Sequence, residues 1–134
     1  MDWLPLVTDE DIAAFIAEVA GFHDGYLRAV HVVFGSGDPG VSPYGDDRQT
    51  AKGRMSIDTP SGPHGRTRLI ELRFDEVVAC HVRPSGPDFD PTVLEAEIVR
   101  RGDIYYWCLA ESLIGGTDST WIGGRRLSWR IADG

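Results

Sequence analysis

Residues 66–74 read RTRLIELRF, and this stretch decides the fold class of the chain. Its side chains alternate between a largely apolar set and a more polar set, the period of two expected of a strand with one buried face. The first set is Arg68, Ile70, Leu72 and Phe74, and the second is Thr67, Leu69, Glu71 and Arg73. One buried and one exposed face is typical of antiparallel pairing, whereas parallel strands are usually apolar on both faces.

Further strands are predicted on both sides of this stretch, because β-branched and aromatic residues recur there between turn residues. They cover residues 26–34, 76–83, 93–101 and 104–110. The chain is expected to close with Trp121-Ile122, a turn at Gly123-Gly124, and a stretch of period two that contains Leu127, Trp129 and Ile131. Asp75-Glu76 is expected to form a short connection, and Leu94 is expected to share a face with Ala96 and Ile98. No helical stretch separates the strands, so parallel crossovers are unavailable. An antiparallel meander of about six strands is therefore predicted.

One amphipathic helix is predicted before the sheet, at about residues 8–21. Thr8 is a suitable N-cap, and Asp11 completes a capping-box-like pair. An apolar stripe with helical spacing follows, formed by Ile12, Phe15, Ile16 and Val19. The predicted fold class is α+β, an N-terminal amphipathic helix packed on a curled antiparallel meander sheet.

The 134 residues are expected to form a single domain, 1–134, because two halves would be too small to bury stable cores. A Gly/Pro-rich insertion at about 35–65 interrupts the pattern, with a short strand at Arg54–Asp58 inside it. Loops this long tend to be functional or disordered. The insertion contains a GxGxxG pattern at 35–40, but Pro39 and Pro43 forbid the helix that a dinucleotide site requires, so no cofactor is predicted.

The formal net charge of −8 argues against nucleic-acid binding and favours a basic protein partner. No apolar run approaches the roughly 20 residues that cross a membrane, and no signal peptide is evident.

Cys80 and Cys108 lie in strand-like segments and are expected to be reduced, buried and without metal. Lys52 is the only lysine beside many arginines, a bias typical of GC-rich bacterial genomes. A soluble, cytoplasmic, bacterial protein is the expectation.

His23-Asp24 is the most suggestive catalytic pair, since a His beside a carboxylate can act as a general base. Its position between helix and strand favours a structural corner instead, with Asp24 satisfying backbone N–H groups and Gly25 left-handed. The four histidines lack metal-ligand spacing, so no metal site is predicted. If the protein is an enzyme, the candidate catalytic residues are His23, Asp24, His81 and Glu71, with a site between the sheet and the 35–65 loop.

One helix covers one face of a sheet, so the other face is expected to meet water or a partner. The candidate binding residues on that face are Glu71, Arg73, His81, Glu95 and Glu97. Burial of the same face in a homodimer, as a self-associating structural subunit, is an alternative.

The segment Phe22-His23-Asp24-Gly25, the strand after it and the closing 127–131 LSWRI resemble a group of small bacterial α+β proteins with an "FHD" corner. Some families of that appearance are grouped with immunity proteins of polymorphic toxin systems. The resemblance implies no catalytic residues. It favours a non-enzymatic protein-binding module that neutralises a basic toxin, with the small enzyme and the self-associating subunit as alternatives.

Overall fold

The structure is a computed structural model, and it describes residues 2–34, 51–60, 62, 65–87 and 90–132. Within these residues one α-helix and two short 3₁₀ helices accompany a sheet of eight strands. The elements are β1 (Leu4–Leu6), α1 (Asp9–Glu18), η1 (Ala20–Phe22), β2 (Gly25–Val33), β3 (Lys52–Thr59), β4 (Arg68–His81), β5 (Thr92–Val93), β6 (Glu97–Arg101), β7 (Ile104–Cys108), η4 (Glu111–Leu113) and β8 (Trp121–Ile131). The predicted α+β class is confirmed.

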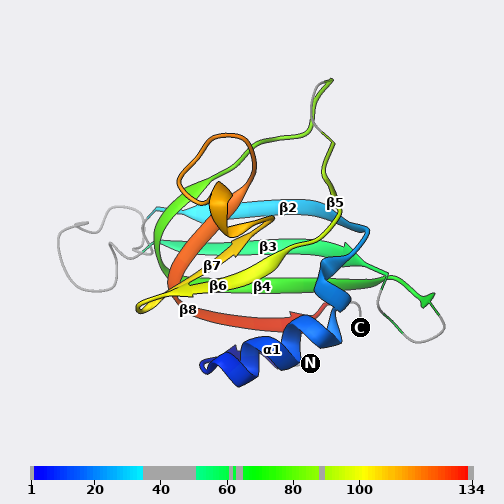
Figure 1. Ribbon diagram of the computed structural model, residues 1–134, viewed down its shortest axis with the longest axis horizontal. Coiled ribbons are helices and arrows are strands. Elements are labelled where there is room, and N and C mark those ends of the chain that lie inside the picture. Colours follow the sequence, from blue (N-terminus) through cyan, green and yellow to red (C-terminus); the bar gives the residue numbers. More distant parts are fainter. Residues whose placement is uncertain (1, 35–50, 61, 63–64, 88–89, 133–134) are drawn as a thin grey trace, which may run out of the picture.

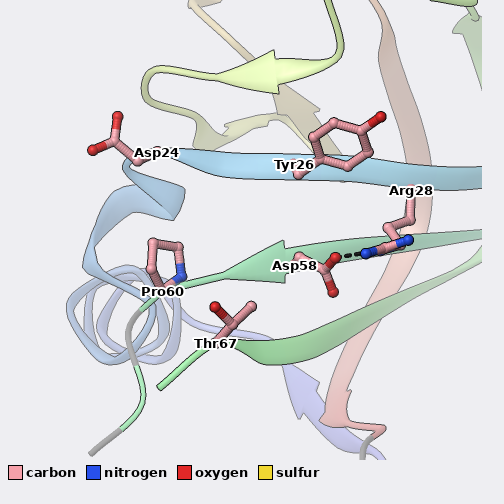
Figure 2. Close-up of a pocket in the computed structure, with 6 residues that line it drawn as sticks. All are labelled: Asp24, Tyr26, Arg28, Asp58, Pro60 and Thr67. Carbon is pink, nitrogen blue, oxygen red and sulfur yellow. Dashed lines mark hydrogen bonds and ion pairs between the residues drawn. The ribbon is translucent and has the colours of Figure 1, made fainter. Parts of the chain in front are cut away.

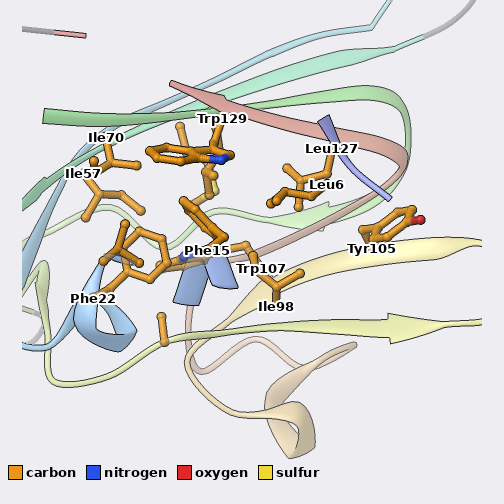
Figure 3. Close-up of a cluster of buried hydrophobic side chains, with 14 of the residues drawn as sticks. Leu6, Phe15, Phe22, Ile57, Ile70, Ile98, Tyr105, Trp107, Leu127 and Trp129 are labelled. Carbon is orange, nitrogen blue, oxygen red and sulfur yellow. The ribbon is translucent and has the colours of Figure 1, made fainter. Parts of the chain in front are cut away.

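The sheet has the order β5-β2-β3-β4-β8-β7-β6, and every pair of neighbours is antiparallel. The short strand β1 pairs with the second half of β8, beyond the residues that pair with β7. The sheet curls into a half-barrel, so β6 and β7 lie across the core from β3 and β4 (Figures 1 and 3). The concave side holds the core, and the outer side of β2, β3, β4 and β8 faces away from it.

The predicted break at Asp75-Glu76 is wrong, because β4 is one strand from Arg68 to His81. Glu76 has a φ of +53°, and the register with β8 shifts between Val77 and Ala79. These are the features of a β-bulge, which bends a strand without ending it. Pairing with β8 continues on both sides of the bulge, and the bend lets β4 follow the curl of the half-barrel.

The short strand predicted at Arg54–Asp58 is present as β3, and it lies in the middle of the sheet between β2 and β4. Met55 and Ile57 are completely buried there. The first part of the predicted insertion, residues 35–50, lies outside the described residues, and so do the GxGxxG pattern and Pro43.

The helix α1 packs on the core with the apolar stripe that the sequence predicts, and Phe15 of this stripe lies within the buried cluster (Figure 3). Both hydrogen bonds of the capping box at Thr8 and Asp11 are present. The Phe15 ring lies 4.7 Å from that of Trp129 and 5.7 Å from that of Phe22, which in turn packs edge-on against Trp107 at 6.2 Å. Aromatic contacts therefore join the helix to strands on both sides of the core.

The corner between α1 and β2 is structural, but not in the predicted way. Positive φ angles occur at Ala20, Gly21, Phe22 and Asp24, and Gly25 is not among them. Gly25 is needed for space, since a Cβ atom there would lie 2.8 Å from the Phe22 carbonyl oxygen. The corner is held by the backbone, because Asp24 N–H donates to the Leu94 carbonyl and Ala96 N–H to that of Gly21.

These bonds also explain why the strand predicted at 93–101 is interrupted. Its residues divide between β5 and β6, and the segment between them bonds to the corner instead of to a neighbouring strand. Ala96 and Ile98 are buried as predicted, whereas Leu94 is 73% exposed.

Candidate docking surface on the outer sheet face

The outer face of β2, β3, β4 and β8 carries most of the basic side chains of the sheet. Directly paired residues of neighbouring strands place their side chains on the same face. One row across the four strands is His31, Arg54, Arg73 and Ser128, and the next row is Ala29, Ser56, Glu71 and Arg130. We call these eight residues, together with Trp3, the outer-face cluster. Their neighbours along each strand are core residues such as Met55, Leu72 and Trp129, so the cluster points away from the core.

Trp3 lies over three arginines of this cluster. Its ring centroid is 4.3 Å from Cζ of Arg130, 4.7 Å from that of Arg73 and 5.3 Å from that of Arg54. These distances are within the range of cation–π attraction. The pairing of β1 with β8 positions the ring, because Leu4 faces Trp129 and the alternation turns Trp3 toward the outer face.

Arg54 and Arg73 face each other directly across β3 and β4. Like charges in such a pair repel each other. The nearest carboxylate oxygen to Arg73 Nε is Asp75 Oδ2, at 3.9 Å, which is too long for a hydrogen bond. Among the described residues, Arg54 forms no ion pair, and the Nε atom of Arg73 is buried without a hydrogen-bond partner. The part of the chain that the structure describes therefore leaves the two guanidinium groups incompletely neutralised.

Arg130 is different from these two arginines. Its Nε donates to Glu71 Oε1 at 2.8 Å, and Glu71 is only 9% exposed. Glu71, predicted as a binding residue and a candidate catalytic acid, is thus paired at the edge of the cluster.

An open cleft of about 650 Å³ lies at the other end of the same face, where Thr67 precedes β4 (Figure 2). Its lining residues are Asp24, Tyr26, Arg28, Asp58, Pro60 and Thr67. Arg28 forms an ion pair with Asp58, and its guanidinium lies 5.6 Å from the Tyr26 ring centroid. Tyr26 is 46% exposed, so it adds an accessible aromatic ring to the outer face.

The predicted binding residues do not form one surface. Glu71 and Arg73 belong to the outer-face cluster, whereas the His81 ring is hydrogen-bonded to the Ser119 carbonyl at the far end of β4. Glu95 is exposed between β5 and β6, and a Glu97 carboxylate oxygen on β6 accepts from the Glu111 N–H.

The candidate catalytic residues are also distributed over the molecule. His23 Nε2 and Asp24 Oδ2 are 3.4 Å apart, with both side chains more than 60% exposed. The other His23 ring nitrogen contacts the Leu94 carbonyl at 2.9 Å. Glu71 and His81 are ten residues apart on one strand, a separation of about 30 Å along extended chain. These four side chains do not converge on one substrate position.

Trp3, Tyr26, Arg54 and Arg130 were not singled out from the sequence. A signal existed for Arg54, because Lys52, Arg54, Ser56 and Asp58 alternate with Gly53, Met55 and Ile57. No sequence pattern places Trp3 over arginines that are far away in the chain.

In the part of the chain that the structure describes, no three His, Cys, Asp or Glu side chains lie close enough together to hold a metal ion. Nor does that part contain a helix with the length and apolar character needed to cross a membrane. A scan against protein-family models and searches of curated proteins and solved structures found no match for the chain.

Proposed function

We propose that this protein is a non-enzymatic protein-binding module whose docking surface is the outer sheet face, from the outer-face cluster to Tyr26. The observation that carries the proposal is the gathering of Trp3, Tyr26 and several arginines on a face that the helix leaves uncovered. Trp, Tyr and Arg are the residue types most enriched at the energetic centres of protein interfaces.

The scaffold under this face also suits binding. Arg54, Ser56, Glu71 and Arg73 stand on β3 and β4, whose backbones are paired on both sides, so little ordering is required there when a partner docks. Ala29 is exposed and Ser56 is half-buried, and both side chains are small enough for a partner to approach the sheet between the larger ones.

The charge of this face differs from the charge of the chain. Its basic side chains are Arg28, Lys52, Arg54, Arg73, Arg126 and Arg130, and its acidic ones are Asp58, Glu71, Asp75 and Glu76, the last of which pairs with Arg126. Carboxylates gather instead in the first turn of α1, at Asp9, Glu10 and Asp11. The basic partner expected from the net charge therefore suits α1 better than the outer face.

A toxin-neutralising role is one form of this proposal, since neutralisation requires that a partner be bound and covered. Catalysis has less support, because Asp24 alone among the four candidate residues lines the described cleft.

Site-specific photo-crosslinking in the source cells tests the proposal. A photoreactive residue at Ser56 should form one adduct of defined mass with another protein, and the same residue at Val99 on β6 should not. An adduct of twice the chain mass would show self-association through this face instead. Equal adducts at both positions, or none at Ser56, would contradict the proposal.

A further inference from the structure

We propose that the partner segment bound by the outer face is acidic, and that Arg54 and Arg73 together hold one of its carboxylates beside the Trp3 ring. This inference rests on the proposed function and adds the chemistry of the partner.

Arg54 and Arg73 occupy directly facing positions, where like charges destabilise a sheet. No described carboxylate lies within hydrogen-bond distance of either guanidinium. A carboxylate placed between the two groups would replace repulsion by two charge-assisted interactions.

The site is already arranged before a partner binds. The Trp3 ring contacts both guanidinium groups and limits the positions that they can take. Arginine side chains lose much rotational freedom on binding, and a ring that already restricts them lowers that cost. The same ring offers an apolar wall to the methylene groups of a bound Asp or Glu.

The mixture of charges on this face favours a protein partner over nucleic acid. Asp58, Glu71 and Asp75 lie among the basic residues of this face, and the whole chain carries a charge of −8. Nucleic acid presents phosphates at regular intervals and requires a continuous basic surface. A protein segment can place carboxylates opposite the arginines and neutral residues opposite Asp58 and Asp75, so an acidic protein segment fits better.

Selection from a displayed library of random short peptides tests the inference with an unbiased probe. Peptides retained by the native protein should be enriched in Asp and Glu. They should lose at least about tenfold in affinity when Arg54→Gln and Arg73→Gln are combined. The matched control is Arg100→Gln with Arg101→Gln, which removes the same charge from the exposed residues of β6 and should leave affinity within about twofold.

A charge exchange separates specific recognition from general loss of stability. The double variant Arg54→Glu with Arg73→Glu, checked for native circular dichroism, should bind a Lys-substituted version of a selected peptide better than the acidic original. The indole N–H resonance of Trp3 should shift when the acidic peptide binds the native protein.

Peptides enriched in Lys or Arg, or equal losses in the variant and its control, would overturn the inference. Competition by a single-stranded oligonucleotide at equal charge concentration would also overturn it and indicate a nucleic-acid site. If the Ser56 adduct forms while the selected peptides are basic, the proposed docking surface is supported and the proposed acidic partner is contradicted. If no adduct forms at Ser56, both proposals are contradicted.

Discussion

Arg130 donates a hydrogen bond from Nε to Oε1 of Glu71 over 2.8 Å, and the two residues face each other directly across β8 and β4. The pair lies under Trp3, whose ring centroid is 4.3 Å from the Arg130 guanidinium carbon. Glu71 is nearly buried, so the ion pair is largely shielded from water. The outer-face cluster thus contains one neutralised arginine beside Arg54 and Arg73, which lack an equivalent partner among the described residues.

Replacing Glu71 with Ala should lower the free energy of unfolding by about 1–3 kcal/mol, because Arg130 keeps its partly buried charge without a hydrogen-bonded partner. Urea unfolding measures the change. The matched control is Glu111→Ala, which breaks the more exposed pair with Arg101 and should cost no more than about 1 kcal/mol. Equal losses for the two variants would show that burial of the Glu71 pair is unimportant.

The two cysteines should differ in reactivity. Cys108 is completely buried, and Cys80 is half-buried, which corrects the expectation that both are buried. In the native protein Cys80 should react with a thiol reagent while Cys108 stays protected. Mass spectrometry of the labelled peptides identifies the site, and a Cys80→Ala variant should show no labelling before denaturation.

Alkaline stability should depend on Cys108. Burial raises the pKa of this thiol from 9.0 to about 12, with a further contribution from the Glu97 and Glu111 carboxylates. Because the pKa of the Cys108 thiol is higher in the folded state, this thiol loses its proton at a lower pH in the unfolded chain than in the folded protein. The free energy of unfolding is therefore unaffected below pH 9.0 and falls as the pH rises from there toward about 12. Cys108→Ala should show a shallower decline over that range in urea unfolding. Parallel curves for the two proteins would contradict the prediction.

The capping box should make the helix sensitive to acid. Backbone hydrogen bonds from Thr8 and Val7, each 3.0 Å long, lower the pKa of Asp11 below its usual 3.8. This stabilisation is present above pH 3.8 and is lost as the pH falls through the folded-state value. An Asp11→Asn variant should therefore lose less stability than the native protein on acidification. Equal losses for the two proteins over this range of pH would contradict the prediction.

Removal of the Thr8 hydroxyl tests the second hydrogen bond of the capping box, in which the Asp11 N–H donates to Thr8 Oγ1. Thr8→Ala should cost about 1 kcal/mol at neutral pH, because the Asp11 N–H loses the acceptor that lies 3.1 Å away. Thermal unfolding followed by circular dichroism measures the loss, and Thr8→Ser, which keeps the acceptor, serves as the control. If Thr8→Ser is as unstable as Thr8→Ala, the hydroxyl is not the source of the effect.

Local patterns in the sequence determined the helix and most of the strands. The capping residues and apolar stripe of α1, and the alternation in RTRLIELRF, depend on neighbours only a few residues away, and the structure confirms both. Where the outcome depended on distant contacts, the prediction failed. Asp75-Glu76 does not end the strand, because β4 continues to pair with β8 through a bulge that follows it, and Leu94 turned outward because its carbonyl bonds to the corner.

The outer-face cluster depends entirely on contacts between residues that are distant in the chain. The sequence shows that Arg73 shares a face with Glu71, since two residues along a strand return to the same side. Only the register between strands decides that Arg54 faces Arg73 and that Glu71 faces Arg130. Trp3 joins them because β1 pairs with a strand that follows it by more than 100 residues, and a register shift of one residue would turn that side chain away. Alternation along the chain is local, but the pairing of strands is set by burial of the whole core.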